Sequence, residues 1–272
     1  MESIEKYYNR WNEECCEEYN RLFPEAKYTI WDGVIFPEQY AKSPLKVMFF
    51  NREPYDPDMS EYDLAKALYT ELIGREKLIF KSQKKLRQRL KEYLCVVNLL
   101  QTGELMNISE ENLINRVNNS TQTDCIFYEM MPSVAYVNVK KSDGQIPSYV
   151  PDLREKAIQG LSILKKQISF FNPSIILAGN IVDRILDHKD VDVEWGNDLY
   201  IPQGKHIICI YQLKINDILY PLVDMYHPSA TQGCMSTYYL DLFRALKEVE
   251  HTYPNYWENR MNLPCFKNFN IE

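Results

Sequence analysis

Four short apolar runs lie along the chain, at residues 47–50, 134–137, 175–178 and 222–226, and each is followed by polar residues. Their length and their content of β-branched and aromatic residues are typical of buried strands. Segments with apolar residues three and four positions apart, typical of amphipathic helices, separate the runs. The alternation predicts an α/β fold with three layers, α/β/α, around a central, mainly parallel four-stranded sheet.

The same pattern divides the chain into parts. Residues 1–23 predict an amphipathic helix that either packs on the domain or binds a partner, and Asp32-Gly33 between apolar residues predicts a hairpin turn. We therefore interpret residues 1–40 as an N-terminal helix and hairpin extension, and 58–120 as a helical insertion, of one domain that spans 1–272. Further helices are expected at 81–100, at 153–171 and at 237–250. A strand pair that turns at 202–205 is expected before the last core strand.

Chemically useful side chains stand directly after the predicted strands. Asn51-Arg52-Glu53-Pro54-Tyr55 follows the first strand, Asn138 lies at the end of the second, and His227-Pro228-Ser229 follows the fourth. The carboxyl ends of parallel strands meet at one edge of a sheet, where ligands bind. We expect Glu53, Asn138 and His227 to meet there.

Composition narrows the possible functions. Only 9 of 272 residues are glycine, and neither GxGxxG nor a Walker-type loop occurs, so a glycine-rich phosphate site is not expected. The net charge of −7 is unlike that of most nucleic-acid-binding proteins. Eight cations nevertheless lie between Arg75 and Lys91, against one acid. This run is either a solvated helix face or a phosphate-contacting patch.

Seven cysteines form no CxxC pair and no spacing suited to zinc. An odd number of cysteines without a secretory leader predicts reduced thiols in a cytoplasmic protein. No apolar stretch of about 18 residues occurs, so a membrane span is not expected.

The residues around the predicted site carry a family resemblance over about residues 45–250. Asn51-Arg-Glu-Pro-Tyr55 resembles the water-activating motif of the uracil-DNA glycosylase superfamily, and Asp224-Met-Tyr-His-Pro-Ser229 resembles its His-Pro-Ser motif. The segment from Ala135 to Lys141 is similar to the family's second strand, whose Asn reads the base, with an Asn-Val-x-Lys pattern like that of family 4. Residues 171–179 are similar to the family's strand after the long helix.

The resemblance implies a monofunctional DNA glycosylase of base-excision repair that flips its base out of the DNA. Glu53 would direct the water and His227 would donate to the departing base. Asn138 would read the pyrimidine edge, and Tyr55 would close off its C5 side. The remaining candidates are Asn51, Arg52, Pro54, Lys140 and Ser229 for substrate, and Lys84, Lys85, Lys91 and Met235 for single- or double-stranded DNA.

This chain departs from the family pattern at several positions. Glu53 and Arg52 stand where family-1 enzymes carry Asp and Gln, and the cysteines of the family-4 iron–sulfur cluster are absent, so we expect no cofactor and no metal ion. Gln232-Gly-Cys-Met235 occupies the place of the loop that wedges into the duplex. Uracil is the first choice of substrate, and a hypermodified pyrimidine of foreign DNA is the second.

Other interpretations remain open from the sequence. Glu53 could pair with a neighbouring cation, Asn138 could cap a turn, and His227 could be a hydrogen-bonded loop residue. The whole chain could be a non-catalytic module that binds nucleic acid or a nucleotide, which its acidic net charge favours. An α/β-hydrolase-like enzyme is less favoured, because no GxSxG motif is present.

Overall fold

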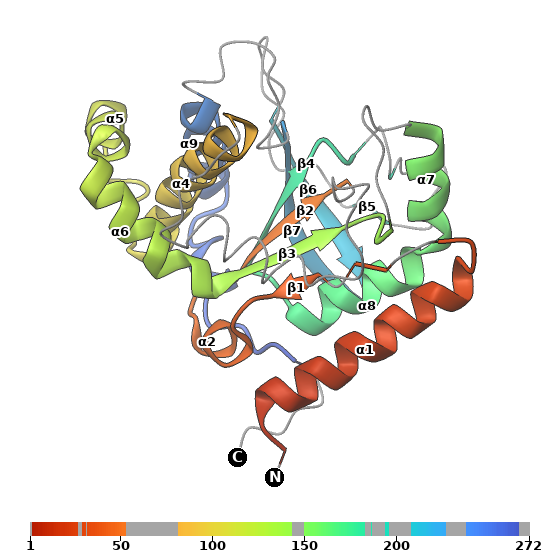
Figure 1. Ribbon diagram of the computed structural model, residues 1–272. Coiled ribbons are helices and arrows are strands. Elements are labelled where there is room, and N and C mark those ends of the chain that lie inside the picture. Colours follow the sequence, from red (N-terminus) through yellow and green to blue (C-terminus); the bar gives the residue numbers. More distant parts are fainter. Residues whose placement is uncertain are drawn as a thin grey trace.

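A mixed β-sheet lies at the centre of the protein (Figure 1). The computed structural model describes residues 2–26, 29–30, 32–52, 81–142, 150–182, 186, 194–195, 208–226 and 238–266. Within these residues the sheet has seven strands in the order β1-β3-β2-β4-β7-β6-β5. Their bounds are β1 Gly33–Val34, β2 Val47–Asn51, β3 Val134–Asn138, β4 Ile175–Gly179, β5 Glu194–Trp195, β6 Cys209–Ile215 and β7 Ile218–Met225.

The four predicted strands form the middle of this sheet. β3, β2, β4 and β7 are neighbours and run parallel to one another. The expectation of four strands is nevertheless wrong, because β1, β6 and β5 extend the sheet with antiparallel pairs. β6 and β7 form a hairpin whose turn residues Asn216 and Asp217 have φ angles of 49° and 62°. Asn and Asp tolerate this left-handed backbone, so the pair is itself a turn signal, although no turn is predicted at this position.

Helices cover both faces of the sheet (Figure 1). α4, α5, α6 and α9 lie on one face, and α1, α7 and α8 lie on the other. Their bounds, with those of the short helices, are α1 Ile4–Leu22, α2 Pro37–Lys42, α4 Lys81–Gln101, α5 Glu110–Asn118, α6 Ser120–Met130, η1 Met131–Ser133, α7 Val150–Gln159, α8 Leu161–Phe171, α9 Tyr238–Thr252 and η3 Glu258–Arg260. The fold is therefore α/β with helices on both sides of the sheet, as the sequence predicts.

Alternation along the central strands supplies both cores. Val47 and Phe49 of β2 pack with the helices on the α4 side, whereas Met48 and Phe50 pack with those on the α8 side. Residues on a strand point to opposite faces in turn, so a strand buried on both faces is a continuous apolar run. For this reason the apolar runs were readable in the sequence.

Serine side chains cap the starts of two helices. The Ser3 hydroxyl accepts the Lys6 N–H at the start of α1, and the Ser109 hydroxyl accepts the Asn112 N–H at the start of α5. These bonds satisfy backbone donors that a helix leaves free in its first turn.

Among the described residues, no helix has both the length and the apolar character that crossing a membrane requires.

Gly33 and Val34 of the expected hairpin form β1 and pair with β3. Residues 27, 28 and 31 lie outside the described residues, so the hairpin itself stays a prediction. One local prediction is wrong. The single helix expected at 153–171 is two helices, α7 and α8, separated at Gly160. A Cβ at Gly160 would lie 3.1 Å from the Lys156 carbonyl oxygen. The close backbone approach favours glycine at this junction, and the apolar stripe alone does not reveal it.

Burial of Glu92 on α4 gives a prediction for stability. Burial raises the pKa of the Glu92 carboxyl, and Gln88 donates to it over 3.0 Å. An acid whose pKa is raised in the folded state makes the fold lose stability as pH rises from its ordinary pKa through the raised pKa. Glu92→Gln should therefore raise the free energy of unfolding at pH 7, and the gain should vanish as pH falls below the ordinary Glu pKa. Urea denaturation across this pH range measures it.

Glu110 is the matched control, since its hydrogen bonds from Arg244, at 2.7 Å each, lower its pKa. Glu110→Gln should lower the free energy of unfolding at neutral pH. This loss should disappear as pH falls through the lowered pKa. A loss of stability at pH 7 in Glu92→Gln would contradict the prediction.

Candidate functional site

The order of the parallel strands defines one edge of the sheet as the candidate site. From β2 the chain crosses to β3 on one side, and later to β4 on the other side. In open α/β sheets ligands bind outside the carboxyl ends of the strands at such a change of direction. Asn51 ends β2, Asn138 ends β3 and Gly179 ends β4, so these residues border the predicted crevice.

Asn51 and Asn138 are direct partners in the pairing of β2 with β3. Both are buried, with 2% and 1% of their surfaces exposed. Phe49 and Tyr136 stand two residues earlier on the same strands and pack on the α4 side, with ring centroids 6.1 Å apart. By the alternation of a strand, both amides lie on that face, next to this aromatic pair.

The side-chain amides of Asn51 and Asn138 have buried atoms without a hydrogen-bond partner among the described residues. Both Nδ2 and Oδ1 of Asn51, and Nδ2 of Asn138, are buried with no hydrogen-bond partner among the described residues. A buried polar group left unbonded costs about 1–3 kcal/mol, so native proteins keep few of them. Three such atoms on two paired residues mark this edge as a place where a polar ligand would gain hydrogen bonds.

A buried ion pair fixes the backbone of Asn138. The Asp32 Oδ2 atom accepts the Asn138 N–H at 2.7 Å, and the Lys141 ammonium donates to the Asn138 carbonyl at 3.0 Å. Lys141 also lies 2.9 Å from both Asp32 carboxylate oxygens, and both side chains are buried. Both backbone polar groups of Asn138 are thus held by one charged pair.

Other elements complete this network. Gln167 of α8 donates to Asp32 Oδ1 at 2.9 Å, and the Lys141 N–H donates to the Tyr19 hydroxyl of α1 at 3.1 Å. Burial raises the pKa of Tyr19 to about 12, so its hydroxyl stays protonated at neutral pH. Helices from the α8 side therefore support the position of Asn138.

The fourth parallel strand is held at the same edge. The Tyr226 N–H, directly before His227 in the chain, donates to the Tyr238 hydroxyl of α9 at 3.0 Å. The Asp224 carboxylate accepts the Ile181 N–H at 2.8 Å and so joins β7 to the segment after β4. These bonds fix where the chain leaves the ends of β4 and β7.

The predicted site residues fall into two groups. Six lie outside the described residues: Glu53, Pro54, Tyr55, His227, Ser229 and Met235. The structure therefore does not place the two predicted catalytic residues. Of the others, Asn51 and Asn138 come together as described, and the Arg52 carbonyl accepts the Lys140 N–H at 3.0 Å. The Lys140 ammonium lies 2.9 Å from Asp152 of α7.

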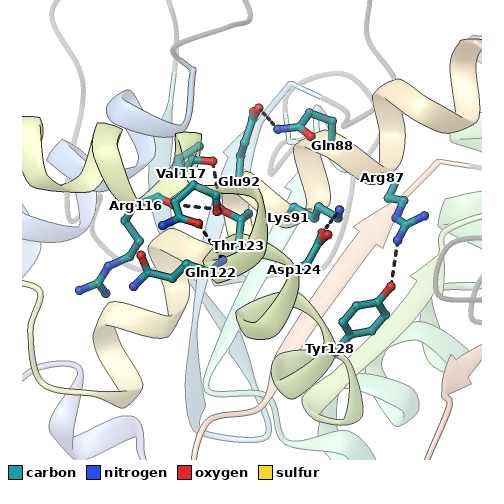
Figure 2. Close-up of polar contacts among 11 residues, drawn as sticks. Arg87, Gln88, Lys91, Glu92, Arg116, Val117, Gln122, Thr123, Asp124 and Tyr128 are labelled. Carbon is teal, nitrogen blue, oxygen red and sulfur yellow. Dashed lines mark hydrogen bonds and ion pairs between the residues drawn. The ribbon is translucent and has the colours of Figure 1, made fainter.

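The cations of α4 differ in their contacts, and Figure 2 shows those of Arg87 and Lys91. Lys91 forms an ion pair with Asp124 of α6, and its ammonium lies over the Phe127 ring, 5.8 Å from the centroid. Arg87 donates to the Tyr128 hydroxyl at 3.0 Å. Lys84 and Lys85 are exposed. Lys91 thus helps to join α4 to α6, whereas Lys84 and Lys85 face solvent.

Part of this site carries no clear signal in the sequence. Asp32 is predicted as a turn residue, and Lys141 stands out only as a cation of the family-like segment. No local pattern marks a pair of charges 109 residues apart as buried partners. Gln167 carried no signal either, because a polar residue among apolar ones on a helix is usually read as exposed. Within the described residues, no group of three or more His, Cys, Asp or Glu side chains is arranged to hold a metal ion.

Comparisons with protein-family models, with curated proteins and with solved structures found no match to this chain.

The network around Asn138 predicts strong coupling between Asp32 and Lys141. Removing one member of a buried ion pair leaves the other charge uncompensated, which typically costs about 3–5 kcal/mol. Asp32→Asn and Lys141→Met should each lower the free energy of unfolding by an amount in this range. The double variant should lose much less than the sum, because no charge is left buried and Asn can still accept the Asn138 N–H. A double-mutant cycle by chemical denaturation measures the coupling.

The neighbouring pair Lys140–Asp152 is the control, since the Asp152 side chain is 37% exposed. Its coupling should be near the range of about 0–1 kcal/mol found for exposed pairs. Equal coupling in the two cycles, or additive losses at Asp32 and Lys141, would contradict the prediction.

Proposed function

We propose that the protein is a monofunctional DNA glycosylase, which flips an aberrant or modified pyrimidine out of DNA and hydrolyses its N-glycosidic bond. Uracil is the simplest base of this class. We also propose that the sheet and its helices are arranged like those of uracil-DNA glycosylases.

One observation carries the proposal: two buried amides with unused hydrogen-bonding atoms stand side by side at the carboxyl ends of β2 and β3. A planar amide offers a donor and an acceptor in one plane, which matches the carbonyl and N–H edge of a pyrimidine. Asn138 is also the residue that the family resemblance makes the base reader. Its support by Asp32 and Lys141 favours a fixed geometry, as base recognition requires.

The proposed chemistry follows from the residues after the strands. Breaking the bond leaves positive charge on the sugar and negative charge on the base. Glu53, two residues after Asn51, would orient a water and stabilise the sugar. His227, next to the anchored Tyr226, would donate to the O2 atom of the departing base. Both groups act on charge that develops in the transition state.

Contact with DNA is assigned to cations at the start of α4. Lys84 and Lys85 are exposed, so their charge is available to phosphates, whereas Lys91 is held by Asp124. A local cationic surface allows an acidic protein to bind DNA, because counterion release depends on the phosphates contacted. The acidic net charge itself favours the second candidate, a module that binds a base or nucleotide without cleavage.

The first test is release of a base. Oligonucleotides with uracil or modified pyrimidines, single- and double-stranded, are incubated with the protein and then cleaved with alkali at abasic sites. Glu53→Gln should lower single-turnover base release by roughly 10²–10⁴-fold, since it removes the charge and keeps the shape. His227→Ala should lower it by roughly 10²–10³-fold, as loss of an oxyanion donor does.

Binding of the same oligonucleotides should change little in these variants, and so should the circular dichroism spectrum. Full turnover by Glu53→Gln would show that the carboxylate is misassigned. A wild-type protein that binds base-containing oligonucleotides and never releases a base would favour the binding module and overturn the glycosylase.

The second test concerns the cations of α4. Lys84→Glu with Lys85→Glu should weaken binding to a 30-nucleotide duplex and should flatten the dependence of log Kd on log salt. If each lysine meets one phosphate, the slope should fall by about 1.8. Fluorescence anisotropy at several salt concentrations measures it.

The control is Lys6→Glu with Arg21→Glu, two exposed cations on α1 that give the same change in net charge. It should leave the slope nearly unchanged. Equal effects of the two double variants would mean that overall charge, and not this surface, governs binding.

A further inference from the structure

A cavity of about 560 Å³ lies between the end of α4 and the chain after α9. One of its lining residues is Pro44, three residues before β2, so the cavity lies at the amino ends of the parallel strands. The candidate site lies at their carboxyl ends. Ligand pockets commonly have volumes of about 300–1,000 Å³. The cavity is therefore large enough for a small organic molecule, and the proposed glycosylase chemistry does not use it.

Apolar side chains form the floor of the cavity. Leu99 and Trp257 line it and are buried. The Trp257 Nε1 atom already donates to the Leu246 carbonyl oxygen at 3.0 Å, so the indole ring offers the cavity an apolar surface. Met106 and Thr102, which also line the cavity, are exposed. A ligand can therefore reach the apolar floor from solvent.

The charges around this apolar floor are negative. Glu250 and Glu258 line the cavity, and none of the described residues that line it is Lys, Arg or His. The Glu250 carboxylate accepts the N–H groups of Asn255 and Trp257, at 2.8 and 3.1 Å, which fix its direction. No ion pair joins either carboxylate to a cation within the described part of the chain. The cavity thus combines apolar surface with two uncompensated negative charges.

The end of α4 adds to this negative potential. The helix ends at Gln101, which lines the cavity, and its last turn contains no basic residue. The C-terminal end of a helix carries a partial negative charge, so a cation near it is stabilised. Lys247 contacts the same wall, but its ammonium donates to the carbonyl oxygens of Met106 and Ile108 and its side chain does not line the cavity.

We propose that this cavity binds a small organic ammonium ion, in which one cationic group is joined to an apolar body. The apolar body packs on Leu99 and Trp257, where its burial stabilises the complex. The ammonium group faces Glu250, Glu258 and the end of α4, which select a positive charge. This assignment does not depend on the proposed glycosylase, since the cavity and the candidate site lie at opposite edges of the sheet.

The test uses three probes that share a benzyl group and differ in charge: 2-phenylethylammonium, 2-phenylethanol and phenylacetate. Binding is followed by NMR of protein labelled with ¹³C at its methionine methyl groups. The methyl signals of Met106 and Met261, which line the cavity, should shift with the ammonium probe, whereas that of Met48, buried in β2, should not. The ammonium probe should bind about 2–30-fold more tightly than the alcohol, the range that a helix end and an exposed carboxylate supply together. Phenylacetate should bind more weakly than the alcohol.

A matched pair of variants assigns this preference to the cavity. Glu258→Gln should reduce the preference for the ammonium probe and leave the Kd of the alcohol nearly unchanged, because it removes one charge and keeps the shape. The control is Glu248→Gln, an exposed acid of α9 that does not line the cavity and gives the same change in net charge. It should keep the full preference. Both side chains are exposed, and circular dichroism checks that both variants fold.

Three results would overturn the proposal. Equal Kd values for the ammonium and the alcohol, or tighter binding of phenylacetate, would show that the cavity does not select a cation. Unchanged Met106 and Met261 signals with every probe would show that the cavity binds none of them. Equal effects of Glu258→Gln and Glu248→Gln would mean that overall charge governs binding. Because the probes contain neither a base nor a phosphate, none of these results bears on base release by the proposed glycosylase.

Discussion

The contact between the Asp32 carboxylate and the Lys141 ammonium joins parts of the chain that are far apart in sequence. Through it, the segment before β1, the end of β3 and helix α8 meet at one buried point. Two opposite charges out of water must satisfy each other closely, or the fold loses several kcal/mol. The pair therefore fixes the relation of these elements, and it fixes Asn138 by its N–H and its carbonyl.

The side-chain amides of Asn51 and Asn138 differ from this ion pair, because they keep buried atoms without a hydrogen-bond partner among the described residues. The carboxylate oxygens of Asp32 accept from Lys141, Gln167 and the Asn138 backbone, whereas the side-chain amide of Asn51 bonds to nothing among the described residues. Stability alone favours apolar residues at such buried strand ends. A rigid support next to unsatisfied groups is the arrangement expected where a protein gives up stability to bind a ligand.

Much of the framework could be predicted because strands and helices are marked by local patterns. The four apolar runs are the four parallel strands, since a strand buried on both faces needs apolar residues throughout. The Ser3 and Ser109 caps are likewise local, since each hydroxyl accepts an N–H three residues later. The edge strands were predicted only in part. A strand pair was expected before the last core strand, and β5 and β6 pair there, but the Asn-Asp turn that joins β6 to β7 was not expected.

The sequence by itself determined the α/β class, the central strands and the polar residues that end them, because these depend on the order of residues along the chain. Only the tertiary structure decided which polar residues are partners. Asp32 reads as a turn residue and Lys91 as one of a run of surface cations, yet Asp32 is buried against Lys141 and Lys91 is paired with Asp124. Burial and pairing depend on segments that meet only in the folded chain, and for this reason the partners of these charges could not be read from their neighbours in sequence.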